Sequence, residues 1–277
     1  MTIKIHHLNC GTLCPVCQRL GNGTGSWTEP GRLVCHCLLI ETPQTLILVD
    51  TGFGSHDIER PWRRLGGSAA LLRPQLQLSE TEVAQVRALG FDPRDVRHLI
   101  PTHLDLDHAG GMSDFPHASV HVFTPELMQL KSPRWRDHVR FRQAQFSYGP
   151  RWQEHNQTSE QWFGFEGIRP IAGLPLDVLL IPLVGHTRGH VGVAVKNQDR
   201  WLLHAGDAYF HHSQLTDQPQ VPLLLNYLEK TIASLPKQRR HNLQRLQQLA
   251  ASHHDQIDIF CAHDPLEFER LAQRSSA

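Results

Sequence analysis

Apolar runs that end in clusters of histidine and aspartate constrain the fold of this chain more than any other feature. The run VRHLIPT leads directly into HLDLDHAGG, and LDVLLIPLV leads into GHTRGH. Farther along, WLLHAGDAYF and DIFCAHD repeat the arrangement. Short apolar runs bounded by turn residues are typical of buried β-strands. The sequence therefore predicts strands whose ends carry polar side chains.

Helix signals alternate with these strands. LVCHCLLI and TLILVD, separated by ETPQ, predict a hairpin of buried strands over residues 33–50, followed by a sharp turn at Asp50-Thr51-Gly52. Ser79-Glu80-Thr81-Glu82 resembles a capping box, so we predict a helix from there to Gly90. Leucines at 235, 243, 246 and 249 predict a late helix. Strands followed by helices in both halves indicate an α/β protein.

One domain over residues 1–277 is expected, because single α/β domains of similar length are common. Residues 131–172 differ from the rest, since they carry many aromatic and charged side chains with little periodicity. We predict that this segment is an insertion packed over the site. Its aromatic residues have two interpretations, ordinary packing or a lid over an apolar acyl chain.

Charge and composition argue against several classes of partner. Lys plus Arg and Asp plus Glu both number 27, so no long-range field favours a polyanion such as nucleic acid. The N-terminus lacks a basic segment followed by an apolar run, and no stretch approaches the length of a membrane span. We expect a cytoplasmic protein that acts on a small molecule, with its oligomeric state, a homodimer included, left open.

Four possible metal ligands stand within six residues. They are His103, Asp105, Asp107 and His108. In an extended segment, side chains at i and i+2 point the same way, and Zn²⁺ accepts both imidazole and carboxylate. On its own the cluster is also compatible with a solvated turn.

Further segments make the metal interpretation stronger. THLDLDHAGG resembles the His-x-His-x-Asp-His signature of the metallo-β-lactamase superfamily, with Asp105 where the second histidine usually stands. The family's remaining segments follow in order, and they supply His186 in GHTRGH, Asp207 in HAGDAYF, His263 in FCAHD and the supporting Asp50 in LVDTG. The resemblance covers roughly residues 33–265.

This resemblance implies a four-layer αβ/βα sandwich of two mixed β-sheets flanked by helices. It also implies two divalent metal ions and a bridging hydroxide that attacks a carbonyl. The residues carried over are His103, Asp105 and His186 for the first metal, Asp107, His108 and His263 for the second, and Asp207 as the bridge. Asp107 and Asp207 are the implied catalytic carboxylates.

The carboxylate at Asp105 changes the charge of the implied site. Three carboxylates and one hydroxide offset two divalent ions completely, which weakens the Lewis acidity of the first metal. Zn²⁺ is the first choice for both positions. Mn²⁺ and Fe²⁺ are alternatives at the Asp105 site, because a carboxylate ligand favours harder ions. A first site that is partly empty in isolated protein is a further alternative.

Hydrolysis of a lactone or ester, acyl-homoserine lactones included, is the favoured function. Tyr209, two residues after Asp207, is a candidate catalytic residue, because the family's lactonases use a tyrosine shortly after the bridging aspartate. The offset differs from theirs, so plain packing is the alternative for Tyr209. A glyoxalase-II-like thioesterase is the second hypothesis, with a basic pocket from Arg134, Arg136, Arg140 and Arg142. The third is a metal-binding protein without hydrolytic activity.

Some remaining cysteines and histidines have interpretations of their own. Cys10, Cys14 and Cys17 form C-x3-C-x2-C, which indicates either reduced thiols or a structural zinc completed by Cys35 or Cys37. The spacing also resembles that of radical S-adenosylmethionine enzymes, but the fold implied downstream is wrong for them. For His190, four residues after His186, we expect a hydrogen bond that supports a ligand, or surface exposure.

Overall fold

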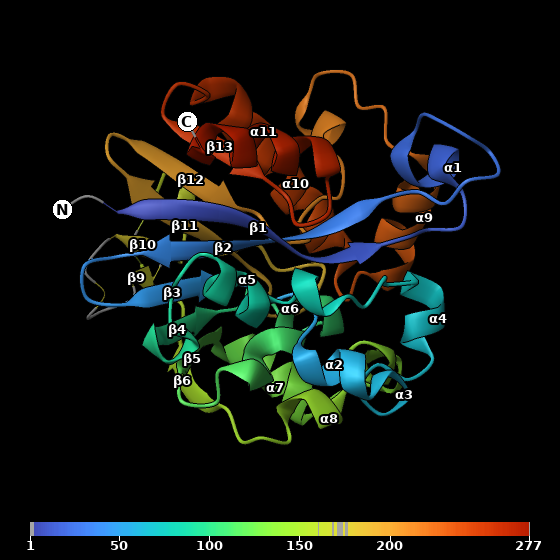
Figure 1. The fold of residues 1–277 in the computed structure, drawn as a ribbon. Coiled ribbons are helices and arrows are strands. Elements are labelled where there is room, and N and C mark those ends of the chain that lie inside the picture. The colour runs from blue at the N-terminus through green and yellow to red at the C-terminus, as the bar shows by residue number, and fades with distance from the viewer. Residues whose placement is uncertain (1–2, 160, 168, 171–173, 175–176, 277) are drawn as a thin grey trace.

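Two mixed β-sheets form the centre of the molecule (Figure 1). The computed structural model describes residues 3–159, 161–167, 169–170, 174 and 177–276. The first sheet has the order β1-β2-β3-β4-β5-β6 and the second the order β13-β12-β11-β10-β9. β1 to β3 pair antiparallel and β3 to β6 pair parallel. In the second sheet β9 to β12 pair antiparallel, whereas β12 and β13 pair parallel.

The strands have the following bounds. In the first sheet they are β1 Lys4–Leu13, β2 Leu33–Glu41, β3 Leu46–Val49, β4 Val96–Ile100, β5 Ser119–Phe123 and β6 Arg151–His155. In the second they are β9 Arg169–Pro170, β10 Val178–Pro182, β11 Val191–Asn197, β12 Arg200–His204 and β13 Ile257–Phe260. A small separate ladder pairs β7 Gln161–Trp162 with β8 Phe165–Glu166.

Helices cover the outer faces of both sheets. In the N-terminal half they are α1 Gln18–Asn22, α2 Ser55–Glu59, α3 Pro61–Arg64, α4 Ser68–Leu72, α5 Glu82–Ala88, α6 Leu106–Ala109, α7 Thr124–Lys131 and α8 Gln143–Phe146. In the C-terminal half they are α9 Leu223–Ile232, α10 Pro236–Ser252 and α11 Pro265–Ser276. Short 3-10 turns are η1 Leu78–Glu80, η2 Pro93–Asp95, η3 Gly110–Asp114, η4 Trp135–Val139 and η5 His212–Leu215.

The apolar pattern of the strands explains the layers. Leu38 and Val193 belong to a core between the two sheets, and Leu39 packs on the opposite face of β2 beneath α5 and α7. Successive side chains of a strand point to opposite faces, so a strand buried on both sides is mostly apolar, as β2 and β3 are. Figure 1 shows α7 and α8 at the lower side of the molecule and α10 and α11 at its upper side. The predicted four-layer α/β sandwich is confirmed.

The predicted helix near residue 80 begins two residues later than expected. Thr81 is the N-cap, because its hydroxyl oxygen accepts a hydrogen bond from the amide of Ala84 at 3.3 Å. Ser79 lies in the preceding turn η1. The end agrees with the prediction, since Gly90 follows with a φ of 89°, a conformation that glycine adopts without strain.

Parts of residues 131–172, the predicted insertion, belong to the two sheets. β6 is the edge strand of the first sheet and β9 the edge strand of the second. The aromatic side chains of Phe141 and Phe146 pack in the core of the first sheet, and Trp162 and Phe165 pack against the second. Residues 160, 168 and 171–172 lie outside the described part. The sequence did not predict β6, because an edge strand with mostly exposed side chains has no apolar periodicity.

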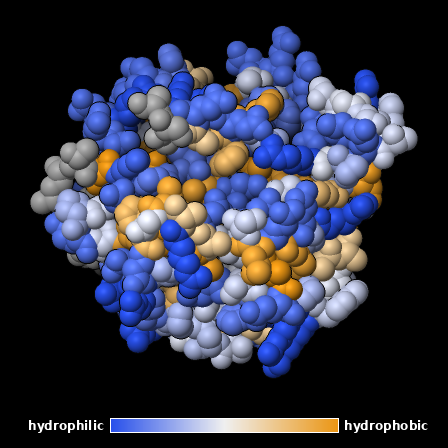
Figure 2. Space-filling model, viewed as in Figure 1, coloured by the Kyte–Doolittle hydropathy of each residue, from blue (hydrophilic) through white to orange (hydrophobic). Residues whose placement is uncertain are grey.

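The visible surface is mixed in hydropathy. On the face shown in Figure 2, hydrophobic residues form small patches among hydrophilic ones. Within the described ranges, no helix combines the length and the apolarity needed to cross a membrane.

Candidate metal centre

The segments that follow four strands bring the predicted ligands together. His103 and Asp105 follow β4, Asp107 and His108 lie on α6, and the others follow β10, β12 and β13. All seven are buried, and they are His103, Asp105, Asp107, His108, His186, Asp207 and His263. The first sheet contributes four of them and the second sheet three, so the centre lies where the two sheets meet.

Asp107, His108 and His263 form a second ligand set around one oxygen of Asp207. His108 Nε2 and His263 Nε2 lie 3.4 and 3.2 Å from Asp207 Oδ1, and 3.4 Å from each other. His263 Nε2 is 3.7 Å from Asp107 Oδ2. Ligands at tetrahedral corners around Zn²⁺ are about 3.3 Å apart, given metal–ligand bonds of about 2.0 to 2.1 Å. The separations therefore fit a metal ion.

His103, Asp105 and His186 form a first ligand set around the other oxygen of Asp207. Asp105 Oδ2 lies 3.4 Å from His103 Nε2 and 2.9 Å from His186 Nε2. Asp207 Oδ2 lies 3.8 and 3.4 Å from the same two nitrogens. His103 Nε2, Asp105 Oδ1 and Asp207 Oδ1 are buried without a hydrogen-bond partner. Buried polar atoms without partners are rare, so these atoms also fit a metal-binding role.

Neighbouring groups orient the histidine rings. His108 Nδ1 donates to Asp50 Oδ2 at 2.9 Å, and His263 Nδ1 donates to the carbonyl of Val34 at 2.7 Å. His103 Nδ1 donates to the Thr102 hydroxyl at 3.0 Å, and that hydroxyl donates to Asp50 at 2.9 Å. A proton held on Nδ1 leaves the lone pair on Nε2, which faces the ligand sets. Asp50 thus supports His108 directly and His103 through Thr102.

His190 supports Asp207, the predicted bridge. Its ring is completely buried, Nδ1 donates to the Leu183 carbonyl at 3.1 Å, and Nε2 accepts from the backbone amide of Asp207 at 2.9 Å. Of the two predictions for His190, the structure favours the supporting hydrogen bond over surface exposure.

The electrostatic environment keeps the carboxylates ionised. Burial acts to raise the pKa of Asp105, but Arg140 and His103 outweigh it and hold that pKa well below its usual range. Burial likewise opposes ionisation of Asp207, and His263 and His108 nevertheless hold its pKa well below normal. Both groups are therefore available as anionic ligands.

The position of Arg140 at this centre was not predicted from the sequence. It follows η4, and its Nη2 lies 3.0 Å from Asp105 Oδ2 and 3.0 Å from His186 Nε2. The sequence suggested only a basic pocket from four arginines, and no spacing could indicate that one of them reaches the ligands. Arg134 and Arg136 are exposed, so the predicted four-arginine pocket does not form as one cluster.

The structure argues against a catalytic role for Tyr209. Its side chain is completely buried, and its hydroxyl donates to the Glu267 carboxylate at 3.0 Å. The ring packs with the apolar residues between the second sheet and α10. Tyr209 therefore follows the alternative prediction, plain packing, because the chain turns its side chain toward α11 after the bridging aspartate.

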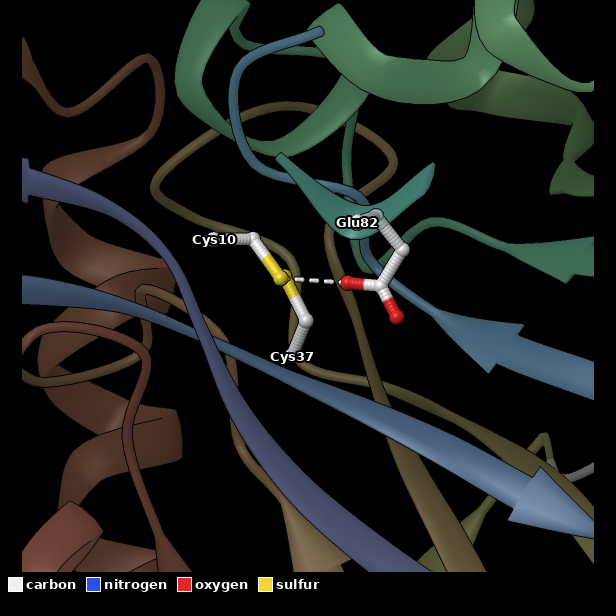
Figure 3. Close-up of side chains that lie close together, drawn as sticks. All are labelled: Cys10, Cys37 and Glu82. Carbon is white, nitrogen blue, oxygen red and sulfur yellow. Dashed lines mark hydrogen bonds between the residues drawn. The ribbon is translucent and has the colours of Figure 1, made fainter. Parts of the chain in front are cut away.

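The N-terminal cysteines do not form one cluster. Cys10 lies beside Cys37 and donates a hydrogen bond to the buried Glu82 carboxylate (Figure 3). Cys14 instead accepts from the Gln75 side chain at 3.4 Å, and all six cysteines are free thiols. The prediction of reduced thiols is confirmed, and the proposed zinc site from Cys10, Cys14 and Cys17 is wrong.

Cys35 lies at the second ligand set. Its sulfur and the ligand atoms of Asp107 and His263 are all within 4.8 Å of one another. Burial and the nearby Asp107 raise the pKa of the Cys35 thiol well above its usual value. The sequence grouped Cys35 with the N-terminal cysteines, because nothing local shows that β2 carries this side chain toward the ends of β4 and β13.

Comparison with known proteins identifies the class. The family model for the metallo-beta-lactamase superfamily matches residues 30–253. The chain therefore belongs to the metallo-β-lactamase superfamily, as its motifs predicted. More particularly, it is a metallo-hydrolase of this superfamily, and membership implies divalent metal ions.

Relatives and solved structures agree with this class. The chain is 40% identical over 264 residues to a probable metallo-hydrolase of Mycobacterium tuberculosis, covering 95% of this chain and 81% of the relative. It is 27% identical over 268 residues to the N-acyl homoserine lactonase AttM of Rhizobium radiobacter, covering 95% and 94%. A solved N-acyl homoserine lactone hydrolase with N-hexanoyl-L-homoserine at its catalytic metal centre shares the fold, with a TM-score of 0.67 at 19% identity over 98% and 97% of the chains.

Proposed function

We propose that this protein is a lactone or ester hydrolase that uses divalent metal ions held by the two ligand sets. The division of Asp207 between the sets carries the proposal, because one oxygen faces His108 and His263 and the other faces His103 and His186. When bound there, a divalent ion lowers the pKa of a coordinated water and polarises a carbonyl group. Zn²⁺ fits the mixture of imidazole and carboxylate ligands.

The chain's own residues prepare the site for this chemistry. Asp50 and the Val34 carbonyl fix the ring protons of His108 and His263 on the nitrogens that face away from the ligand sets. His190 fixes the backbone of Asp207. Burial excludes bulk water from these groups, so their lone pairs stay directed at the ions and need not reorganise during the reaction.

A cavity beside the centre offers room for the apolar part of a substrate. Its volume is about 240 Å³, and its apolar walls come from Leu33, Phe210, Leu225 and Leu266. The Phe210 ring contacts the rings of His186 and His263, with centroids 5.9 and 5.6 Å apart. We place the acyl chain of the substrate in this cavity and its carbonyl on the ligand side of Phe210.

A lactone or simple ester suits this site better than a glutathione thioester. Glutathione carries two carboxylates, which need free cationic side chains nearby. Neither nearby arginine is free, because Arg140 is held by Asp105 and Arg32, which lines the cavity, pairs with Glu269 at 2.7 Å. The named lactonases among the relatives support the same substrate class.

The test compares turnover of three substrates by metal-loaded and chelator-stripped protein. An acyl-homoserine lactone, a simple aryl ester and a glutathione thioester are matched in acyl group where their chemistry allows. We expect the lactone or ester to be hydrolysed, the thioester to be poor, and activity to return when Zn²⁺ is restored. His263→Ala serves as the ligand-deficient control.

Either of two results would contradict the proposal. Preferred hydrolysis of the thioester would favour the glyoxalase-II-like alternative. Bound metal with no turnover on any substrate would favour a metal-binding protein without hydrolytic activity.

A further inference from the structure

The Arg140 guanidinium is fixed in the middle of the first ligand set. Nη2 contacts Asp105 Oδ2 and His186 Nε2, each at 3.0 Å. Nη1 donates to the His186 carbonyl at 2.9 Å and lies 3.3 Å from the Ser234 hydroxyl. Only 12% of the side chain is exposed. Four contacts on a mostly buried side chain define one position, which is not the behaviour of a mobile surface arginine.

The chemistry of these contacts makes Arg140 and a metal ion competitors. A guanidinium only donates hydrogen bonds and stays charged at any ordinary pH, so in its hydrogen bond with Arg140 the His186 Nε2 lone pair is the acceptor. That nitrogen has a single lone pair, which cannot bind Nη2 and a metal ion at the same time. An ion that uses His186 must first displace Nη2 from it.

The replacement at Asp105 explains why an arginine lies here. A carboxylate attracts a guanidinium, and a histidine at this position would give Arg140 no anionic partner. The charges also balance, because one divalent ion and one guanidinium offset the three carboxylates of Asp105, Asp107 and Asp207. The second ligand set has no such competitor, since among the described residues no lysine or arginine nitrogen forms an ion pair with Asp107 or with Asp207.

We propose that Arg140 is a built-in cation of the first ligand set. The protein then holds one divalent ion firmly, in the second ligand set, and takes up a second ion only by displacing Arg140. This inference rests on the proposed metal-dependent function and specifies how many ions the resting protein keeps. Arg140 is a positioning residue here, because it acts through Asp105 and His186.

The test is a measurement of metal content and affinity rather than of activity. Wild type and Arg140→Met are loaded with Zn²⁺, dialysed against chelators of increasing strength, and analysed for metal per chain. We expect wild type to keep one ion and Arg140→Met to keep two. The weaker site should become about 10-fold to 100-fold tighter in the variant, because an entering ion no longer has to break the charge-assisted hydrogen bonds of Arg140.

Arg188→Met is the matched control. Arg188 is also a partly buried arginine, and its Nη2 lies 3.4 Å from Asp137 without contacting a ligand. The control should keep one ion, like wild type. Two ions of similar affinity in wild type, with no change in Arg140→Met, would overturn the proposal.

A second variant keeps the test decisive if Arg140→Met fails to fold. Asp105→His removes the carboxylate partner of Arg140 and restores an imidazole ligand, so it should also raise the metal content from one ion to two. An unchanged content of one ion would contradict the proposal. Failure of the proposed hydrolase function looks different, because it would leave the metal counts as expected while no substrate is turned over.

Discussion

Replacing Asp50 with asparagine should weaken metal binding although Asp50 is not a ligand. Asp50 follows β3 and is 2% exposed. Its Oδ1 accepts from the Thr102 amide at 2.7 Å, and its Oδ2 accepts from His108 Nδ1 at 2.9 Å and from the Thr102 hydroxyl at 2.9 Å. In Asp50→Asn the side-chain oxygen of the new asparagine can still accept the hydrogen bond from the backbone amide of Thr102. Its NH₂ group then faces His108.

That NH₂ group reverses the hydrogen bond. It donates to His108 Nδ1, which moves the ring proton to Nε2 and removes the lone pair that faces Asp207 and His263. Supporting carboxylates of this kind usually contribute 10-fold to 100-fold in metal affinity, or about 1.4 to 2.7 kcal/mol. We expect Asp50→Asn to lower the metal affinity at least about tenfold. The loss should not be smaller, because Asp50 also supports His103 through Thr102.

The assay is competition for Zn²⁺ between the protein and a chromophoric chelator, with circular dichroism as a check on folding. Asp114→Asn is the control, because Asp114 is a partly buried carboxylate that accepts from the amide and hydroxyl of Ser55 and contacts no ligand. A folded Asp50→Asn protein that binds Zn²⁺ as tightly as wild type would refute the reasoning.

Three further predictions concern other parts of the chain. Burial raises the pKa of Glu82 from 4.5 to about 8, so its carboxyl group is protonated in the folded state at neutral pH, and stability falls as pH rises from the unfolded value toward 8. Glu82→Gln should not lose this stability, so between about pH 5 and pH 8 its free energy of unfolding should rise by about 3 to 4 kcal/mol relative to that of wild type. Urea denaturation measures the difference, and equal pH profiles would contradict this. Tyr209→Phe should lose about 1 to 2 kcal/mol of stability because Glu267 loses a donor, while kcat stays within about threefold; a large fall in kcat without loss of stability would restore the catalytic role. Leu225→Trp narrows the proposed acyl cavity, so the substitution should raise KM for a long-chain lactone about tenfold more than it raises KM for a short-chain lactone. Equal changes in the two KM values would place the acyl chain elsewhere.

Local patterns in the sequence predicted an α/β protein, and the family resemblance implied the four-layer sandwich. The apolar runs of β2, β3, β10 and β11 appear as nearly continuous hydrophobic segments, because strands buried on both faces need apolar side chains at most positions. The polar residues that follow strands, read together with the resemblance, identified the seven candidate ligands, since the residue that follows a strand stays at the same sheet edge in the fold. β6 could not be predicted in this way, because exposed polar positions on an edge strand carry no such pattern.

Tertiary structure alone decided which side chains meet these residues. Arg140 reaches Asp105 across 35 positions of sequence and His186 across 46, and Cys35 approaches His263 from the other end of the chain. The sequence likewise did not predict that the Tyr209 hydroxyl donates a hydrogen bond to Glu267. Strand and helix periodicity depends on neighbours within a few residues, so the sequence determined the elements and the order of the ligands. Contacts between side chains on different elements depend on how those elements pack, and packing exists only once the whole chain has folded.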